Sequence, residues 1–504
     1  MPIDITGRAS PGWWLNLLAQ RANARLLGSG RQVGLNTLWD YYSGDPPPPT
    51  SAANAKEAWA AFMRQARTNF AELVVEAVRD RLQVTGIRTG AAADEAGDEA
   101  AWRIWQANSL DADQATLFRL ALVMRESYVI VGDPSGSDHG EPVITVEDPR
   151  QVITAQDPVD KRRVRAGLKQ WCDYDEGVER AYLYLPGAVF RAARELPTPQ
   201  SYYGTAYPIS GVRPVATGFY GWEWDGPPQV LPETLAGRVP IVRFVNQPDA
   251  YGFGRGEFEG HTDVLDRINT MILQRVVIAV MQAFRQRALR KAADAEPLPR
   301  VDPVTGEDID YDQVFAADPA ALWDLPPGID IWESASADLG PLLQADRSDV
   351  LHLAAVTRTP MHYLSPEGAN QTAEGASLVR EGNISKVTDR QRVFGESVEA
   401  MMSLAFLWKG DLERASLVDM ETLWQAADQY TLTERMAAAV QAKAAGLPWE
   451  TILREVLQFT PQQIARADAE RASDLLFAPL DTAPAAAPGR GSMPEPMMEP
   501  GGRA

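Results

Sequence analysis

The stretch that decides the fold runs from Phe258 to Lys291 and reads FEGHTDVLDRINTMILQRVVIAVMQAFRQRALRK. It contains no proline, so it can form one helix of up to about 45–50 Å at about 1.5 Å per residue. Its most apolar run, Val276–Phe284, is bounded by Arg275 and Arg285. That run is far shorter than the roughly 20 residues that cross a bilayer. We therefore expect a long helix in a protein that does not span a membrane.

The segment that follows breaks the helical pattern. Three prolines between residues 297 and 303 cannot continue a helix, and an acidic stretch with Trp323 and Trp332 comes next. Helical spacing returns from Leu339 to Val356. The sequence thus predicts two helices joined by a proline-rich insert.

A second break separates this helix from a longer one. Proline lacks an N–H and disfavours helical geometry in the residue before it, so Thr359-Pro360 ends the helix. Residues Ser365 to Gln371 are small or polar and favour turns. The pattern from Thr372 to Trp408 is again helical and heavily charged. We expect a polar loop between the two helices.

The first 250 residues combine helices with strands. Helical patterns cover Trp13–Leu27 and Ala52–Leu82. Residues 125–250 contain short β-rich runs, of which Tyr128–Gly132 and Val143–Val146 are typical of a hairpin. The predicted fold class is α+β, mainly helical, with a sheet inserted between helical blocks.

The C-terminal part reads as short helices followed by a biased tail. Helical patterns cover Ala415–Asp428, Thr433–Ala445, Trp449–Leu457 and Pro461–Leu476. Residues 477–504 are rich in Ala, Pro, Gly and Met without periodicity, so we expect them to be disordered.

Charge excludes one class of function. The 504 residues include 68 acidic and 48 basic ones, for a net charge of −20. A uniformly basic nucleic-acid binder does not have this balance. An acidic wall along which DNA slides remains compatible with it, because like charges repel. The N-terminus has no basic segment followed by an apolar run, so we expect no secretory signal and a soluble intracellular or assembly protein.

Motifs for catalysis, metals and cofactors are absent from the sequence. The four histidines stand at no metal-ligand spacing, there is no G-x-S-x-G elbow, and no Gly-Lys pair exists for a P-loop. The single cysteine, Cys172, has no histidine nearby in sequence and is expected to be buried. We therefore expect no enzyme activity, no metal and no cofactor.

One glycine-rich stretch resembles a dinucleotide loop at first sight. It spans Gly252 to Gly256, but the position of the third glycine is Glu257, and no βαβ unit surrounds it. We interpret it as a flexible joint that leads into the long helix.

Several phrases together resemble one family. They are LWDYYSGDPPPP (38–49), ARTNFAELVVEAVRDRLQVTGI (66–87), Gly254–Glu257 leading into DVLDRINTMI (263–272), AAVTRTPMHYL (354–364) and EGASLVREGNISKVTDRQRVFGESVEAMMSLA (374–405). In this order and spacing, over most of residues 10–475, they resemble the portal proteins of tailed bacteriophages, in the branch common among long-tailed phages of actinobacteria.

The resemblance implies a portal fold and a structural function. It implies a homo-oligomeric ring, usually a dodecamer, at one capsid vertex, which serves as the conduit for DNA packaging and ejection. The implied partners are further copies of the chain, the terminase large subunit, a head–tail adaptor protein, the major capsid and scaffold proteins, and double-stranded DNA that passes without sequence specificity. The implied location is the virion, with the host cytoplasm during assembly.

The resemblance also divides the chain into regions. They are a wing (1–255), a first stem helix (256–290), a clip (291–337), a second stem helix (338–357), a tunnel loop (358–372), a tunnel helix with further wing (373–410), a crown (411–476) and the tail (477–504).

Three groups of candidate functional residues follow from these regions. The tunnel loop implies channel residues Ser365, Gly368, Asn370, Gln371 and Thr372. A basic group that could face the channel, or acidic clip residues of a neighbouring subunit, comprises Arg285, Arg287, Arg290 and Lys291. Candidate clip residues for the adaptor or terminase are Asp302, Asp308, Asp310 and Trp323.

Two other functions stay open at this point. One is another phage head-assembly protein, such as a minor capsid protein. The other is a hydrolase whose acidic active site is not recognised.

Overall fold

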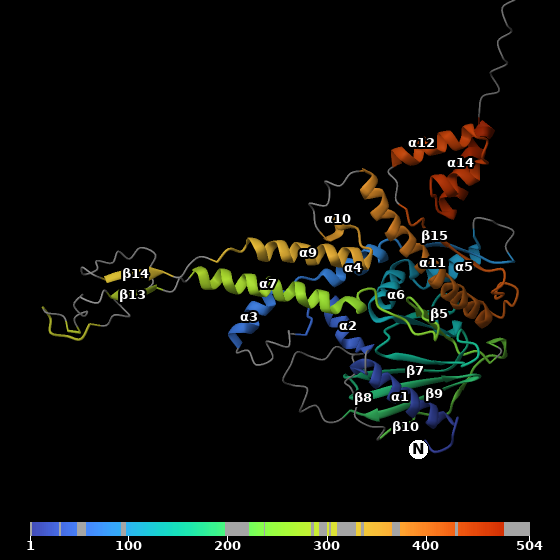
Figure 1. Cartoon of the computed structure of the whole chain (residues 1–504). Coiled ribbons are helices and arrows are strands. Elements are labelled where there is room, and N and C mark those ends of the chain that lie inside the picture. Colours follow the sequence, from blue (N-terminus) through green and yellow to red (C-terminus); the bar gives the residue numbers. More distant parts are fainter. Residues whose placement is uncertain are drawn as a thin grey trace, which may run out of the picture. The chain divides into compact units, whose positions relative to one another are not determined.

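The computed structural model describes residues 3–29, 32–47, 57–91, 97–196, 221–235, 237–283, 287–291, 300–301, 304–309, 329–333, 337–364, 373–428 and 432–477. The chain divides into two compact units, Met1–Tyr430 and Thr431–Ala504. The fold is α+β, as predicted (Figure 1).

The centre of the first unit is a three-stranded antiparallel sheet of order β12-β4-β5. Its strands are β4 (Glu126–Gly132), β5 (Val143–Glu147) and β12 (Ile241–Val245). Six of the seven β4 residues are buried, because helices α6 (Leu110–Met124) and α11 (Ala373–Lys409) both pack against this strand. The predicted hairpin is confirmed as the β4–β5 pair.

A second antiparallel sheet has the order β10-β9-β8-β7-β6, with β11 also paired to β9. Its strands are β6 (Val152–Gln156), β7 (Val164–Asp173), β8 (Val178–Leu185), β9 (Ala188–Glu195), β10 (Glu223–Trp224) and β11 (Gln229–Val230). Helix α1 (Pro11–Leu27) packs Leu15 and Leu18 against Leu168 and Leu183 of this sheet. The β-rich character predicted for residues 125–250 is therefore confirmed where the structure describes them.

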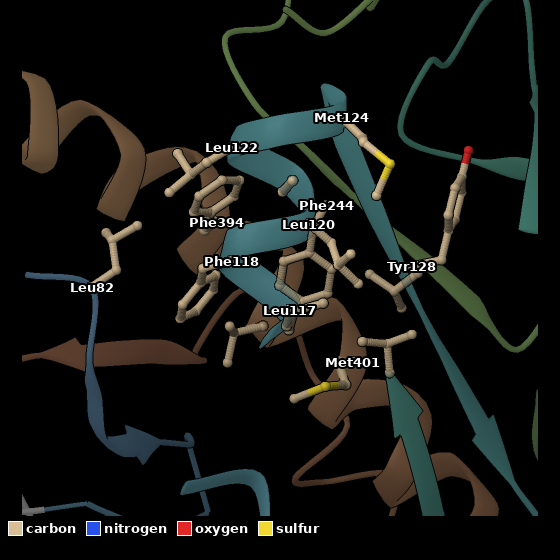
Figure 2. Packing of buried hydrophobic residues seen from close by; sticks show 14 of the residues in the cluster. Leu82, Leu117, Phe118, Leu120, Leu122, Met124, Tyr128, Phe244, Phe394 and Met401 are labelled. Carbon is tan, nitrogen blue, oxygen red and sulfur yellow. The ribbon is translucent and has the colours of Figure 1, made fainter. Parts of the chain in front are cut away.

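Aromatic rings join the helices to the first sheet (Figure 2). Phe118 of α6 stacks on Phe394 of α11, with ring centroids 5.4 Å apart and an angle of 16° between planes. Phe244 of β12 lies 6.4 Å from Phe118 and 6.3 Å from Phe394. Because all three rings are fully buried, the core fixes α11 against the sheet.

Three further helices of the first unit contribute to the candidate functional site. They are α7 (Thr262–Ala283), α9 (Gly340–Thr357) and α10 (Met361–Leu364). The predicted helices 339–356 and 372–408 are confirmed as α9 and α11. The break at Thr359-Pro360 is confirmed too, since α9 ends at Thr357.

The long first helix is shorter than predicted. Helix α7 ends at Ala283, and Arg287–Lys291 forms strand β13, which pairs antiparallel with β14 (Ile329–Glu333). The prediction of one helix to Lys291 is therefore wrong at its C-terminal end. The absence of proline permits a helix but does not impose one, and a strand from a later part of the chain supplies the backbone partner.

Two other helix predictions are corrected. Residues 52–82 contain two helices, α3 (Glu57–Ala66) and α4 (Phe70–Arg79), because Asn69 caps α4 by accepting a 3.2 Å hydrogen bond from the Glu72 N–H. Within 415–428, strand β15 (Glu421–Trp424) pairs with β3 (Val84–Arg88). Residues 411–428 therefore belong to the first unit.

The remaining elements of the first unit are short. They are β1 (Gly28–Ser29), β2 (Gln32–Val33), α2 (Leu35–Tyr42), α5 (Glu99–Ala107) and the 3₁₀ turns Pro134–Gly136, Glu233–Leu235 and Glu259–His261.

The second unit is helical, as predicted. It contains α12 (Leu432–Ala444), α13 (Trp449–Thr451) continued by a π-helical turn (Ile452–Val456), and α14 (Pro461–Phe477). Ile452, Leu453 and Ile464 are its buried apolar residues among those described. In the described part of the chain, no helix is both long enough and apolar enough to cross a bilayer.

The glycine-rich stretch before α7 is packed rather than flexible. A Cβ at Gly254 would lie 2.4 Å from the Arg125 carbonyl oxygen, and one at Gly256 would lie 2.6 Å from the Val123 carbonyl oxygen. The Glu257 N–H donates a 2.8 Å hydrogen bond to the Leu122 carbonyl. The glycines therefore let this stretch approach the α6–β4 backbone closely, and the flexible-joint interpretation is wrong.

We expect Gly256→Ala to lower the free energy of unfolding by about 1–3 kcal/mol, because the added methyl meets backbone that cannot rotate away. Gly382→Ala in α11 is the matched control, since a Cβ there meets nothing within 4 Å. This control should raise the free energy of unfolding by about 0.5–1 kcal/mol. Denaturant unfolding measures both, and a Gly256→Ala variant as stable as the parent chain would contradict the close packing.

Candidate functional site

The chain's long helices meet at a buried carboxylate. Glu257 has a side chain that is 1% exposed, and its Oε2 lies 2.7 Å from Lys386 Nζ. Arg390 Nε donates a 2.9 Å hydrogen bond to Oε1 of the same carboxylate. Lys386 and Arg390 stand one turn apart on α11, so one carboxylate just before α7 holds two cations of α11.

Neighbouring polar groups complete this cluster. Asn246 and Gln247, which follow β12, donate side-chain hydrogen bonds of 3.1 and 3.2 Å to Glu257 Oε1. Lys386 Nζ also donates a 2.9 Å hydrogen bond to the Thr357 carbonyl at the end of α9. The cluster therefore links the segment after β12, the entry to α7, the end of α9 and the middle of α11. We call Glu257, Lys386 and Arg390 the junction cluster.

The Glu257 carboxylate of the junction cluster is ionised at neutral pH. Burial alone would raise the pKa of Glu257, but the charges of Lys386 and Arg390 outweigh it and lower this pKa to about 2. A carboxylate with a lowered pKa stabilises the fold above its unfolded-state pKa, and that contribution is lost as the pH falls through the folded-state value.

A second ion pair fixes the entry to α7. Arg125, between α6 and β4, donates hydrogen bonds of 2.8 and 2.6 Å from Nε and Nη2 to the Glu259 carboxylate. The Gly256 N–H donates a 3.0 Å bond to the same carboxylate. The start of α7 is thus tied to the core on both sides of Phe258, which is itself fully buried.

Helices α7 and α9 run side by side and antiparallel (Figure 1). Arg267 binds Asp349 through two hydrogen bonds of 2.8 Å each, and Arg275 Nη1 lies 3.4 Å from Asp346 Oδ2. Toward the far end, Gln282 donates a 3.1 Å bond to the Ala337 carbonyl. Partly exposed ion pairs stabilise little, so their main effect is to set which residues of the two helices face each other.

The N-terminal helices support α7 from another side. Tyr41 donates a 2.7 Å hydrogen bond to Asp266 Oδ1, and the Thr68 N–H donates a 3.0 Å bond to Asn269 Oδ1. Burial raises the pKa of Tyr41, so its hydroxyl stays a neutral donor. Tyr41 and Thr68, which belong to two of the phrases that carry the resemblance, thus contact α7.

The candidate tunnel-loop residues lie outside the described residues: Ser365, Gly368, Asn370, Gln371 and Thr372. The two flanks of that loop are described. Leu364 at the end of α10 is buried, and α10 packs on α4 and α9. On the other flank α11 begins at Ala373. Both flanking elements therefore pack in the same unit as the junction cluster.

The other candidate residues are only partly described. In the β13–β14 ladder Arg287 lies opposite Glu333, Arg290 opposite Asp330 and Lys291 opposite Ile329. Asp308 forms an isolated antiparallel bridge with Val301. The structure therefore brings Arg287, Arg290 and Lys291 together on one strand. Arg285, Asp302, Asp310 and Trp323 lie outside the described residues.

No metal-binding group of three His, Cys, Asp or Glu residues occurs among the described residues. Cys172 is buried in β7, as predicted. His352 is exposed on α9, with its Nδ1 3.8 Å from Asp349 Oδ1.

Sequence reasoning missed the junction cluster. Glu257 was considered only as the position where a third glycine should stand. One signal was available: Lys386 and Arg390 share a face of α11 with Val387 and Phe394, which carry the apolar pattern of that helix. Two cations on an apolar helix face indicate a buried anion, because an unpaired buried charge is very costly.

We expect Glu257→Gln to lower the free energy of unfolding at pH 7 by about 3–5 kcal/mol, because Lys386 and Arg390 are left buried without a counter-charge. The difference from the parent chain should shrink as the pH falls from about 5 toward 2, where the parent carboxylate itself becomes protonated. Denaturant unfolding across this pH range measures both effects.

Glu396→Gln is the control for that experiment. Glu396 is 62% exposed and lies 3.3 Å from Arg162, which is 85% exposed. Its loss should change the free energy of unfolding by less than about 0.5 kcal/mol. Equal effects of the two substitutions would show that the junction cluster does not stabilise the fold.

Comparison with known proteins connects this architecture to a family. Residues 34–474 match the family described as "Phage portal protein, SPP1 Gp6-like". The chain is 28% identical over 388 residues to the portal protein of Mycobacterium phage D29, covering 75% of this chain and 72% of that protein. It is 27% identical over 392 residues to the portal protein of Mycobacterium phage L5, with the same coverage.

Proposed function

Because this chain belongs to the SPP1 Gp6-like family of phage portal proteins, we propose that twelve copies form a closed ring at one capsid vertex and that double-stranded DNA passes through its centre during packaging and ejection. Portal proteins are structural components of the virion rather than enzymes. The family assignment favours this function over the two alternatives, a minor capsid protein and a hydrolase. The observation that carries the proposal is the antiparallel α7–α9 pair, which the junction cluster holds at its base.

In this proposal α7 and α9 form the stem, and residues 291–337 between them form the clip. The elements before α7, together with α11, form the wing. We place the start of the crown at Thr431, not at residue 411, because β15 pairs with β3 of the first unit. The loop between α10 and α11 is the tunnel loop.

Charge supports a conduit that does not hold DNA tightly. Twelve chains of net charge −20 make a strongly negative ring, and phosphates are repelled by such a surface. In the β13–β14 ladder Arg287 lies opposite Glu333 and Arg290 opposite Asp330. Oppositely charged residues in register stabilise a ladder, so we assign these basic residues to pairing within the clip of one chain rather than to binding DNA.

The proposed partners follow from the family. We propose that the clip, including Asp302, Asp308, Asp310 and Trp323, binds the terminase large subunit during packaging and a head–tail adaptor afterwards. We propose that the wing contacts the major capsid and scaffold proteins while heads assemble in the host cytoplasm.

Negative-stain imaging and native mass spectrometry of the purified chain test the ring. We expect closed rings with a central hole, because apolar side chains such as Leu343 and Leu351 are 48% and 46% exposed on α9 and need cover from a neighbour. A monomer that persists at micromolar concentrations under every salt condition would contradict the proposal.

Replacing residues 366–371 with a shorter Gly-Ser linker tests the tunnel loop. We expect rings to form normally but assembled heads to retain less DNA, because Asn370 and Gln371 would no longer offer uncharged, short-lived hydrogen bonds to phosphates in the channel. Ring yield is compared with nuclease-protected DNA per head. The control is the same replacement at residues 136–139, an exposed turn after β4. If heads with the shortened loop retained as much DNA as parental heads, the loop would be an ordinary surface connection.

A further inference from the structure

Two loops at one end of the second sheet lie against each other. The first, residues 157–163, joins β6 to β7, and the second, residues 247–253, follows β12. Lys161 of the first loop donates a hydrogen bond from Nζ to the Ala250 carbonyl of the second. The same Nζ lies 5.9 Å from the centre of the Tyr251 ring. The loops therefore form one continuous surface.

Hydrogen bonds hold the backbone of each loop. Asp249 Oδ1 accepts bonds of 2.8 and 2.9 Å from the N–H groups of Tyr251 and Phe253. Asp157 Oδ1 accepts a 2.8 Å bond from the Val159 N–H, and the Asp157 N–H donates a 2.8 Å bond to the Arg163 carbonyl. These aspartates bond to their own loops, so the loop conformations are set before any partner binds.

The ordered loops carry apolar side chains outward. Val159 is 92% exposed, Tyr251 78% and Phe253 59%. Four basic residues of the same end are also exposed: Lys161, Arg162, Arg163 and Arg165. One of them, Arg162, lies 3.3 Å from Glu396 of α11 but stays 85% exposed. Aromatic and arginine side chains on a rigid scaffold are typical of the residues that dominate protein interfaces. We call these seven residues the basic loop face.

The opposite end of this sheet has the opposite charge. Strand β7 is 10 residues long, so its two ends lie about 33 Å apart at about 3.3 Å per residue. At the far end, around the β7–β8 turn, five carboxylates are exposed: Asp175, Glu176, Glu195, Glu223 and Asp225. Two of them, Glu176 and Asp225, share Arg180 as an ion-pair partner, so carboxylates still exceed cations in this group. The strand register places these residues at the same end of the sheet, since Glu195 lies opposite Val178 and Glu223 lies opposite Ala193. We call these five residues the acidic end.

We propose that the basic loop face of one subunit docks on the acidic end of a neighbouring subunit. The proposal rests on the ring of the proposed function and names the surfaces through which its wings touch. A ring needs a heterologous interface, in which two different surfaces of the same chain meet. Chains of net charge −20 repel each other, so a contact between oppositely charged surfaces reduces that repulsion where the subunits approach.

Nucleic acid is the other partner that a basic loop suggests. Phosphates would engage Arg162 and Arg163, but they give no role to Val159, Tyr251 and Phe253, which the loops hold in solvent. A protein surface buries such side chains and gains the hydrophobic free energy. The combination of apolar and basic side chains therefore favours a protein partner.

Charge reversal in the full-length chain tests the interface. The first variant is Arg162→Glu with Arg163→Glu, the second is Asp175→Arg with Glu195→Arg, and the third combines all four changes. Each double variant should raise the subunit concentration needed for half-maximal ring formation at least tenfold, because like charges then face each other. The combined variant should return toward the parental concentration, because opposite charges face each other again. Arg8→Glu with Arg21→Glu is the control for net charge, since both residues are exposed and belong to neither surface.

The outcomes separate this inference from the proposed function. If the parent chain forms no ring, the proposed function fails. If the parent forms rings and both double variants assemble as it does, or if the combined variant gives no recovery, the docking inference is overturned and the ring stands. If the first variant assembles normally but loses binding to a duplex DNA probe, the basic loop face belongs to nucleic acid and the inference is overturned. Circular dichroism and thermal unfolding unchanged from the parent confirm that each variant is folded.

A second variant tests the apolar part of the same face. Tyr251→Ser with Phe253→Ser leaves every charge in place and removes two side chains that are 78% and 59% exposed. We expect this variant to form rings less readily than the parent chain. The difference should remain at high salt, where charge effects are screened. Unchanged assembly at high salt would overturn the assignment of these aromatic residues to the interface.

Discussion

A single buried carboxylate sets the relation between the helices on which the rest of this structure depends. Glu257 receives Lys386 and Arg390 from α11, while Lys386 also binds the last carbonyl of α9. Removing one partner of such a cluster leaves uncompensated charge in the interior, so the three helices keep one arrangement. The entry to α7, the end of α9 and the middle of α11 are therefore positioned together.

The same use of charge recurs through the first unit. Glu126 of β4 is buried between Arg25 of α1 and Arg243 of β12, whose charges outweigh burial and lower its pKa to about 2. Asp98 caps α5 and binds Arg414, which lies beyond α11. Each of these buried carboxylates is matched with a cation from a distant part of the chain. Several arginines and lysines therefore pair with buried carboxylates and do not contribute positive charge to the surface.

A net charge of −20 agrees with the proposed conduit, through which DNA would pass without tight binding. Some basic residues are buried in ion pairs, such as Lys386 and Arg390, and others are exposed on the loops at one end of the second sheet. The acidic surface lowers affinity for phosphate. The ordered loops at the sheet end carry basic and aromatic side chains together, a mixture typical of residues that dominate protein interfaces.

The sequence by itself determined the elements whose signals are local. Helix α9, helix α11 and the break at Thr359-Pro360 follow from periodicity and from the missing N–H of proline, so they were predicted within one or two residues. The β4–β5 hairpin follows in the same way. The resemblance to portal proteins rests on such phrases in order. Only the tertiary structure decided that Arg287–Lys291 and Glu421–Trp424 are strands and that Glu257 is the centre of a charge cluster. Each of these depends on a partner far away in the chain, and local patterns carry no information about which distant group will supply a hydrogen bond or a counter-charge.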